Sequence, residues 1–240
     1  MVTGISCNKH GNITVEECAD CSECLPRPFI MTFKQPTYTN DPKVYGLREI
    51  IYCLRKAYFE RIIKAVDEYV PLKELWMRKR GKYIEKIAQS GRYHELPGAY
   101  EVDVEGEKVE IRATLDCYDY KNGTLIEVKS TRVNRDKLPR RADVIQVKCY
   151  GTIFKDILAG IKVLKIVYLD FYDFLTINVD IEDMSEYLTG RVTTLHNALK
   201  RGTPPDPERS SYCTYCPCKN ECTQVDLVPD EKITVQTIEG

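Results

Sequence analysis

The spacing of apolar residues along the chain changes between the period of a helix and the period of a strand. Helical spacing covers four segments, residues 45–70, 75–88, 141–158 and 183–201. Alternating spacing covers five segments, YEVDV, VEIRATLDCYDY, TLIEVKS, KVLKIVYLDF and TINVDI. Helices, a three-stranded meander, a helix, two strands and a final helix together predict an α/β fold with a mixed central sheet flanked by helices.

Both ends of the chain depart from this pattern, which predicts four regions. Residues 1–30 have few core-forming apolar residues and many cysteines, and 31–44 form a linker. Residues 45–223 hold the predicted helices and strands, and 224–240 form a tail. No apolar run reaches the roughly 18 residues of a membrane span, and the N-terminus lacks the features of a signal peptide. We therefore expect a cytoplasmic protein without membrane contact.

The eleven cysteines are clustered rather than spread along the chain. The two clusters are Cys7, Cys18, Cys21 and Cys24 near the N-terminus, and Cys213, Cys216, Cys218 and Cys222 near the C-terminus. Cys53, Cys117 and Cys149 are isolated between them. In an intracellular chain, C-x2-C spacing favours metal binding over disulfides.

One predicted hairpin brings charged residues together. Asn122-Gly123 indicates a two-residue type I′ turn, and the resulting register places Asp116 opposite Lys129. Because side chains alternate along a strand, Asp116, Glu127 and Lys129 then project from one face. A simpler interpretation is an exposed hairpin with a cross-strand salt bridge, and the local pattern alone leaves both interpretations open.

Two neighbouring carboxylates repel each other unless a cation lies between them, and hard oxygen ligands suit Mg²⁺ or Mn²⁺. Lys129 could orient or deprotonate a water molecule, or stabilise charge on a phosphate. The helix that follows carries Gln146 and Tyr150 four residues apart, hence on one face. This helix strengthens the interpretation of the hairpin as a site.

The net charge of −1 counts mildly against a nucleic-acid-binding protein. The basic residues are nevertheless grouped in two runs. The first run is Arg78, Lys79, Arg80 and Lys82, and the second is Arg132, Arg135, Lys137, Arg140 and Arg141. A basic run is usually a solvated face, but the second lies directly after the charged hairpin. We expect both runs to contact phosphates.

The Asp116, Glu127-Val128-Lys129 and Gln146-x-x-x-Tyr150 motifs together resemble those of RecB-type nucleases in the PD-(D/E)XK superfamily. The resemblance implies a restriction-endonuclease-like core and metal-dependent hydrolysis of DNA. Asp116, Glu127 and the carbonyl of Val128 would hold the metal, and Lys129 would assist the attacking water. Gln146 and Tyr150 would orient the site.

The cysteines narrow this resemblance to the iron–sulfur branch, and above all to the fourth family of CRISPR-associated (Cas) proteins. In that branch one cysteine precedes the nuclease core and three follow it as C-x2-C-x5-C. Cys53 matches the first, although Leu54 stands where proline is usual. The matching tail residues are Cys213, Cys216 and Cys222, which leaves Cys218 as a spare. The resemblance favours a [4Fe–4S] cluster here, although the four thiols alone could equally hold zinc.

The chain departs from this family in two places. Glu85 stands where the family usually has a metal-supporting histidine, and His94 is a second candidate for that role. The N-terminal cysteines Cys7, Cys18, Cys21 and Cys24, with His10 as an alternative ligand, form an additional set that predicts a zinc ion. A second iron–sulfur cluster is the alternative.

The first hypothesis is an Mg²⁺- or Mn²⁺-dependent exonuclease that acts on single-stranded DNA or DNA ends. The resemblance implies a role in CRISPR spacer acquisition, with CRISPR adaptation proteins as partners. DNA repair or replication in a mobile element or virus is the alternative role. Two other hypotheses remain, a nucleic-acid- or protein-binding module without catalysis and a redox sensor that uses the cluster.

Overall fold

A mixed sheet lies at the centre of the computed structural model. The structure describes residues 2–21, 23–31, 33, 41–62, 68–88, 94–131, 134–158, 160–170, 172–219, 221–222 and 237–238. The strands of this sheet are β3 (Val44–Gly46), β5 (His94–Val104), β6 (Glu107–Asp119), β7 (Thr124–Ser130), β8 (Val163–Leu169), β9 (Phe174–Val179) and β10 (Thr237–Ile238). Their order is β10-β9-β8-β7-β6-β3, and β5 pairs with β6. The pairs β7–β8 and β3–β6 are parallel and the other pairs are antiparallel. The predicted α/β fold with a mixed sheet is confirmed.

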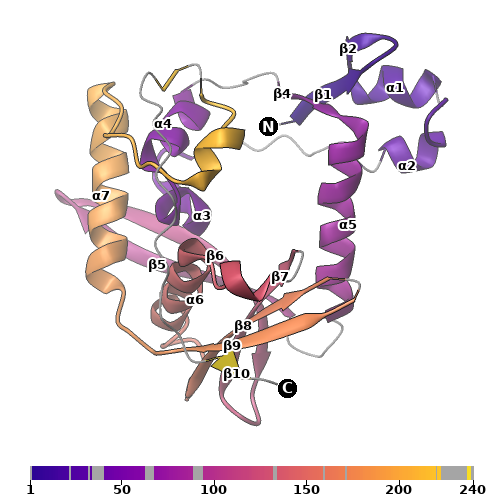
Figure 1. Cartoon of the computed structure of the whole chain (residues 1–240). Coiled ribbons are helices and arrows are strands. Elements are labelled where there is room, and N and C mark those ends of the chain that lie inside the picture. Colours follow the sequence, from indigo (N-terminus) through magenta and orange to yellow (C-terminus); the bar gives the residue numbers. More distant parts are fainter. Residues whose placement is uncertain are drawn as a thin grey trace.

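Helices cover this sheet, and their buried side chains form the hydrophobic core together with those of the strands (Figure 1). They are α3 (Leu47–Ile51), α4 (Leu54–Ile62), α5 (Leu72–Ala88), α6 (Arg141–Ile153) and α7 (Ser185–Arg201). The helices α3, α4, α6 and α7 pack against one another, and α5 lies against β7. Buried residues such as Leu115, Leu164, Val147 and Leu188 fill the space between the sheet and the helices, so hydrophobic burial fixes their positions. We call this unit the main domain.

The segment expected as one helix over residues 45–70 is divided into β3, α3, α4 and β4 (Glu68–Pro71). The chain leaves the helical conformation at Tyr52, which is extended. The Arg191 side chain donates hydrogen bonds to the carbonyl groups of Ile50 and Tyr52 at this break. A helix end needs such partners for its last carbonyl groups, and no spacing rule reveals a partner that lies 139 residues further on.

The hairpin of β6 and β7 differs from its predicted register by two residues. Asp119 pairs with Thr124 and Cys117 with Ile126, so the connecting loop has four residues instead of two. The Asp119 carboxylate accepts hydrogen bonds from the backbone of Lys121, at 3.0 Å, and of Asn122, at 3.3 Å. A shift of two residues preserves the faces of a strand, so the predicted convergence of charges survives. Asp116 falls opposite Glu127 instead of Lys129 when this register is continued.

A smaller unit stands beside the main domain. Its strands β2 (Gly11–Ile13), β1 (Val2–Cys7) and β4 form a sheet in that order, accompanied by α1 (Val15–Cys21) and α2 (Arg27–Met31). We call residues 2–33 together with β4 the N-terminal module. Contrary to the expectation of few core-forming residues, Ile5, Val15 and Ile30 are buried in it with Val70 and Leu75.

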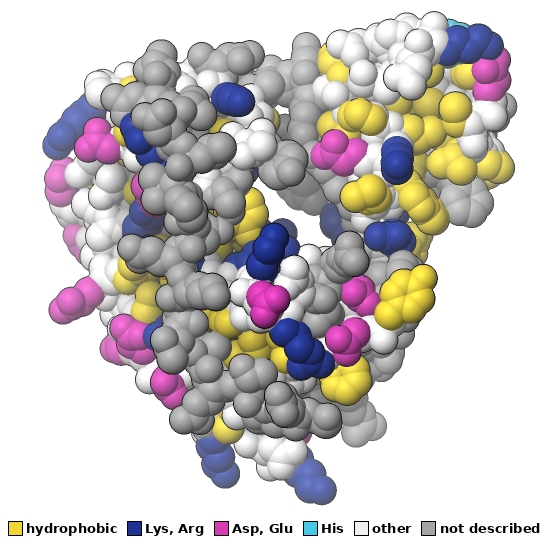
Figure 2. Space-filling model, in the orientation of Figure 1, with side chains coloured by type: hydrophobic (Ala, Val, Ile, Leu, Met, Phe, Trp, Pro, Cys, Tyr) yellow, Lys and Arg dark blue, Asp and Glu magenta, His cyan; other side chains and the backbone are white. Residues whose placement is uncertain are grey.

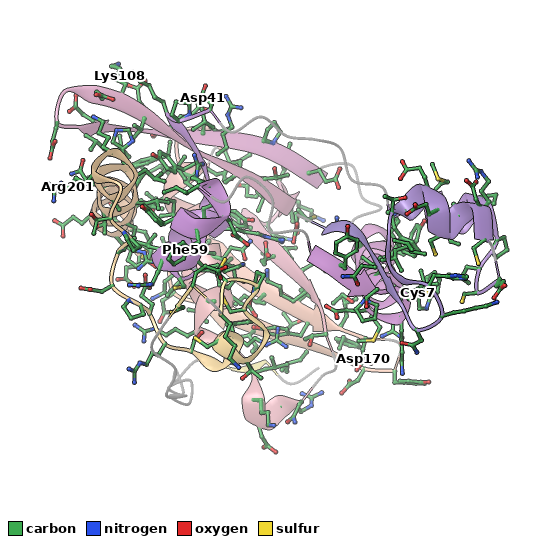
Figure 3. The ribbon with its side chains drawn as sticks, turned by 90° about the horizontal axis from the view of Figure 1, so that it is seen from above. Cys7, Asp41, Phe59, Lys108, Asp170 and Arg201 are labelled. Atoms are coloured by element: carbon green, nitrogen blue, oxygen red, sulfur yellow. The ribbon has the colours of Figure 1, made fainter. Side chains whose placement is uncertain are left out.

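Helix α5 connects the two units, because Leu75 near its start belongs to the core of the N-terminal module and its later turns lie against β7 (Figure 1). Seen from above, Cys7 and Arg201 lie at opposite sides of the molecule (Figure 3). Among the described residues, no helix is both long enough and apolar enough to cross a membrane.

Candidate active site

Two carboxylates from neighbouring strands form the centre of the site. Glu127 on β7 is only 1% exposed, and its Oε2 atom has no hydrogen-bond partner among the described residues. Asp116 on β6 accepts a hydrogen bond from the backbone N–H of Val128 through Oδ2, at 2.8 Å. A buried carboxylate oxygen without a partner is costly, and a bound cation would satisfy it.

The electrostatic environment of Glu127 supports this interpretation. The pKa of Glu127 is raised to about 8, mainly by burial and also by the nearby charge of Asp116, against the opposing effect of Lys129. A divalent cation would reverse this balance, because metal ligands bind in their deprotonated form. Asp116 and Glu127 therefore fit a hard divalent ion such as Mg²⁺ or Mn²⁺.

A chain of polar contacts links Glu127 to α6. Lys129 Nζ lies 2.5 Å from Glu127 Oε1 and donates a hydrogen bond to Gln146 Oε1 at 2.8 Å. Gln146 Nε2 in turn donates to the hydroxyl group of Tyr150 at 2.7 Å. Because these side chains are buried or nearly so, the contacts fix their orientation. The structure thus brings together the residues that the sequence motifs assigned to the site.

Asp143 extends this chain and was not found from the sequence. It is 1% exposed in the first turn of α6, and its Oδ1 lies 3.8 Å from Lys129 Nζ. The hydroxyl group of Tyr168 on β8 donates to Asp143 Oδ2 at 2.8 Å. The one sequence feature that could have revealed Asp143 is its place on the apolar face of a helix, where an unpaired charge is rarely found. Asp143 is therefore a second buried carboxylate near the ammonium group of Lys129, besides Glu127.

A cleft of about 650 Å³ opens next to Asp116, and we call it the active-site cleft. Its basic lining residues are Arg48, Lys79, Lys82 and Arg112. Arg48 was also missed by the sequence analysis. Desolvation is the largest single influence on Arg48 and lowers its pKa, but Glu127, Asp116 and nearby tyrosine hydroxyl groups together outweigh it, so the pKa is raised. Figure 2 shows Lys and Arg side chains around the hollow beside α5.

The other predicted site residues lie in several places. Lys82 lines the cleft, whereas Arg140 donates a hydrogen bond to Thr131 Oγ1 at 2.9 Å and Arg80 and Arg141 are exposed. The side chains of Arg78, Glu85 and His94, and the whole of Arg132, fall outside the described residues. The choice between Glu85 and His94 thus stays a prediction.

The sequence model of the PD-(D/E)XK nuclease superfamily matches residues 46–223. The chain belongs to this superfamily. The solved structure of the protein SSO0001 is similar to 78% of this chain and 89% of its own, with 16% identity and a TM-score of 0.60. A candidate exonuclease from Eubacterium rectale aligns over 86% of this chain and 85% of its own, with 14% identity and a TM-score of 0.34. No curated protein matches the chain.

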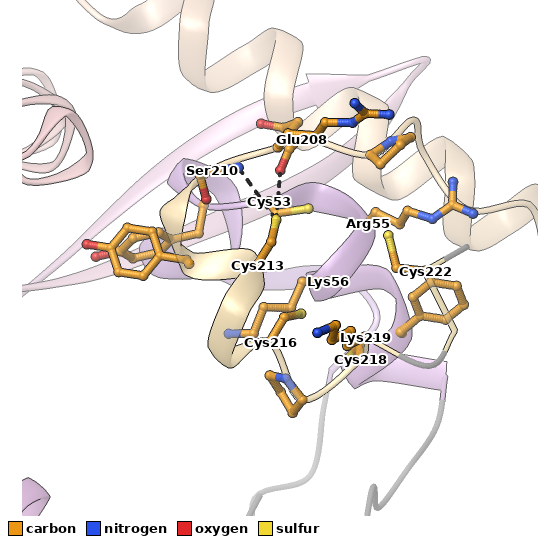
Figure 4. Close-up of a pocket in the computed structure, with 16 residues that line it drawn as sticks. Cys53, Arg55, Lys56, Glu208, Ser210, Cys213, Cys216, Cys218, Lys219 and Cys222 are labelled. Atoms are coloured by element: carbon orange, nitrogen blue, oxygen red, sulfur yellow. Dashed lines mark hydrogen bonds between the residues drawn. The ribbon is translucent and has the colours of Figure 1, made fainter. Parts of the chain in front are cut away.

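Five cysteines of this PD-(D/E)XK protein line a second cavity, of about 250 Å³ (Figure 4). Cys53 precedes α4, and the other four, Cys213, Cys216, Cys218 and Cys222, lie in or after the short 3-10 helix Ser211–Tyr215. The basic residues Arg55, Lys56 and Lys219 line the same cavity. Positive charges of this kind suit a group of thiolates.

Among these thiols, burial raises the pKa of Cys216, with smaller contributions from Cys53 and Cys213. Ser210 also donates its backbone N–H to Cys213 Sγ at 3.5 Å. Burial raises the pKa of Cys218 to about 12, and this side chain is 1% exposed. Burial thus favours the protonated thiols, and a bound metal group would have to displace these protons. The convergence of the five thiols beside basic residues still fits a group held by several thiolates, and Cys218 is the most deeply buried of the five.

In the N-terminal module, the ligand atoms of His10, Cys21 and Glu23 lie within 4.8 Å of one another. His10 Nε2 is 3.5 Å from Cys21 Sγ, while Glu23 is also paired with Lys9 at 2.6 Å. Within the part of the chain that the structure describes, this is the one group of three metal-ligating side chains at such short distances. Burial raises the pKa of Cys18, and the thiols of Cys7, Cys24 and Cys21 lie near enough to Cys18 to raise it further.

Proposed function

We propose that this PD-(D/E)XK protein is an Mg²⁺- or Mn²⁺-dependent exonuclease that acts on single-stranded DNA or DNA ends. The observation that carries the proposal is Glu127, a buried carboxylate beside Asp116 with one oxygen that no described residue hydrogen-bonds. A salt bridge or an ordinary hairpin would not require a buried carboxylate oxygen without a hydrogen-bond partner, whereas a bound cation would be coordinated by that oxygen.

Within the proposed site, each residue has a distinct task. Asp116, Glu127 and the carbonyl group of Val128 would hold the divalent ion, which when bound supplies positive charge to the scissile phosphate. Lys129 is held by Glu127, Gln146 and Asp143, so its ammonium group stays in place to orient the attacking water or to stabilise negative charge. Arg48 and Lys82 would bind neighbouring phosphates.

We further propose that Cys53, Cys213, Cys216 and Cys222 hold a [4Fe–4S] cluster. The convergence of their thiols on one cavity beside basic residues supports this assignment. The cluster would have a structural task, because it would join the start of the main domain to its end. For the N-terminal module we propose a zinc ion. Its ligands would be Cys7, Cys18, Cys21 and Cys24, with His10, which lies near Cys21, as the alternative ligand.

For the biological role, the resemblance to the fourth Cas family supports DNA trimming during CRISPR spacer acquisition, together with adaptation proteins. Repair or replication in a mobile element or virus is the alternative. A catalytically weak module that only binds nucleic acid is a further candidate, because the basic cleft serves binding as well as cleavage.

The test uses protein purified anaerobically and single-stranded DNA labelled at either end, with Mg²⁺ or Mn²⁺. We expect metal-dependent shortening of linear strands and little cleavage of circular strands. Asp116→Asn and Lys129→Ala should each reduce the rate by about a hundredfold or more, because they remove a metal ligand and the fixed cation.

The matched control is Lys121→Ala, which removes an exposed lysine from the loop of the same hairpin and should cleave like the wild type. Full activity of both site variants would refute the site. Binding of DNA without any cleavage would favour the binding module, and cleavage of circular strands would indicate an endonuclease.

A further inference from the structure

One face of α5 combines exposed aromatic rings with positive charge. Trp76, Lys79 and Tyr83 are spaced by three and four residues, so they lie on the same side of the helix. Trp76 is 40% exposed and Tyr83 is 50% exposed. Lys79 Nζ lies 6.0 Å from the centre of the Tyr83 ring, which is within cation–π range. We call these three residues the α5 stripe.

The α5 stripe leads into the active-site cleft. Lys79 and Tyr83 line this cleft together with Lys82 and the catalytic Asp116. Trp76 lies nearly two helical turns before Tyr83, toward the N-terminal module, at an axial separation of about 10 Å. Two to three stacked bases fit this separation, because stacked bases are about 3.4 Å apart along one strand.

The packing of α5 on its neighbours leaves this stripe partly exposed. Leu75 is buried in the core of the N-terminal module, and the backbone at Gly81 approaches Ser130 of β7. On the helix, Gly81 lies roughly opposite Trp76 and Tyr83. Neither aromatic ring belongs to a core, and of the two Tyr83 lines the cleft.

We propose that the α5 stripe binds the unpaired bases of single-stranded DNA, with Trp76 and Tyr83 as stacking platforms. This proposal rests on the proposed nuclease function and narrows its substrates to single strands, with the residues that would bind their bases. Four basic residues line the cleft against the two carboxylates of Glu95 and Asp116, so charge complementarity favours a DNA strand as the occupant. A duplex cannot use the rings in this way, because its bases are already stacked on one another. The α5 stripe therefore selects single strands for the catalytic carboxylates.

The test exploits the fact that Trp76 is the only tryptophan of the chain. The full-length protein is titrated without added divalent metal, so that the DNA stays intact, first with a thymidine oligonucleotide and then with an abasic oligonucleotide of equal length. Both strands carry the same phosphates, and only the first carries bases. We expect the thymidine strand to quench the tryptophan fluorescence and to bind about tenfold more tightly, whereas the abasic strand leaves the fluorescence unchanged.

Variants assign the effect to the stripe. Trp76→Ala and Tyr83→Ala should each weaken binding of labelled thymidine strands by about tenfold, while abasic strands bind as before. Met77→Ala is the control, because Met77 is 51% exposed on another side of α5 and should bind both strands like the wild type. Stacking would be refuted if the aromatic variants bound the thymidine and the abasic strand more weakly by the same factor. It would also be refuted if the wild type bound both strands with the same affinity.

The outcome for stacking is separate from the outcome for catalysis. Base-dependent binding and quenching in a protein that fails to cleave DNA with Mn²⁺ would preserve the stripe and refute the nuclease. Cleavage at equal rates by the wild type and both aromatic variants, without base-dependent binding, would preserve the nuclease and refute the stripe.

Discussion

Glu127 shows how a single side chain can limit the chemistry of a site. Its carboxylate is buried against another carboxylate and an ammonium group, and one of its oxygens has no hydrogen-bond partner in the part of the chain that the structure describes. Folding alone would favour a neutral residue at this position. Without a bound metal ion the buried Glu127 carboxylate destabilises the folded protein, which is the expected cost of a metal site that is formed before the ion binds.

This cost gives a pH-dependent prediction. The pKa of Glu127 is about 8 in the folded protein against an ordinary value of 4.5. The protonated side chain therefore contributes stability that is fully present below pH 4.5 and is lost as the pH rises from 4.5 to 8, where the folded protein must bury the ionised carboxylate. Without divalent metal, Glu127→Gln should therefore be more stable than the wild type at pH 8 by a few kcal/mol, and the difference should shrink toward pH 5.

Thermal unfolding with and without Mn²⁺ measures this effect. We expect Mn²⁺ to raise the melting temperature of the wild type at pH 8 and to leave that of Glu127→Gln unchanged. Glu101→Gln, an exposed carboxylate on β5, is the control and should behave like the wild type. A variant less stable than the wild type at pH 8 would contradict the assigned environment of Glu127.

The residues that the sequence revealed are those with a local signature. Asp116, Glu127 and Lys129 were recognisable because strand alternation and a turn signal place them on one face. Arg48 and Asp143 lacked such a signature, since their importance comes from contacts across α3, α6 and β7. Contacts of this kind depend on tertiary packing, which spacing along one segment does not encode.

At the scale of elements, strands with strong alternation were predictable and short, mixed segments were not. The helices α5 and α7 and the strands β5 to β9 occur where the apolar spacing placed them. Segment 45–70 failed because its buried residues, including Tyr45, Ile50 and Tyr58, contact the core from several elements. The hairpin register failed because the Asp119 side chain replaces backbone partners in a longer loop.

The N-terminal module offers a prediction about metal content. Cys21 belongs both to the four-cysteine set and to the group with His10 and Glu23, so Cys21→Ser should reduce zinc from about one ion per chain to a small fraction. Because His10 Nε2 lies 3.5 Å from Cys21 Sγ, we expect His10→Ala to lose zinc as well. Elemental analysis of the purified variants measures both.

The control for this measurement is Cys117→Ser, which changes a thiol on β6 in the main domain and should retain zinc. Full zinc content in His10→Ala together with its loss in Cys18→Ser would exclude histidine and leave the ligand set of four cysteines. Full zinc content in Cys21→Ser would exclude both ligand sets, the four cysteines and the group of Cys21 with His10 and Glu23.

At the scale of the whole molecule, the proposed cluster joins segments that are about 160 residues apart. Cys53 lies at the break between α3 and α4, and its partners follow α7 near the end of the described domain. Glu208 already links the two regions, because it accepts the backbone N–H of Leu54 at 3.1 Å and pairs with Arg191 at 2.7 Å. A cluster would reinforce an existing contact.

Removing one of its ligands should therefore affect iron and stability together. Cys53→Ala should lose most of the iron and the brown colour and should unfold about 5 °C lower, a loss of about 2 kcal/mol. Iron analysis and thermal unfolding of anaerobic protein measure this change. Cys218→Ser changes a thiol in the same cavity that the assignment leaves spare, so it should keep its iron. Iron retained by Cys53→Ala would refute the cluster.

The position of β1 has a consequence for how the protein is made. This strand is the middle one of its sheet, and its partner β4 begins only at Glu68. While the ribosome is still synthesising the intervening segment, one edge of β1 has no strand to pair with. The N-terminal module can thus be completed only when the start of α5 has been made, so β1 must wait for the helix that borders the cleft.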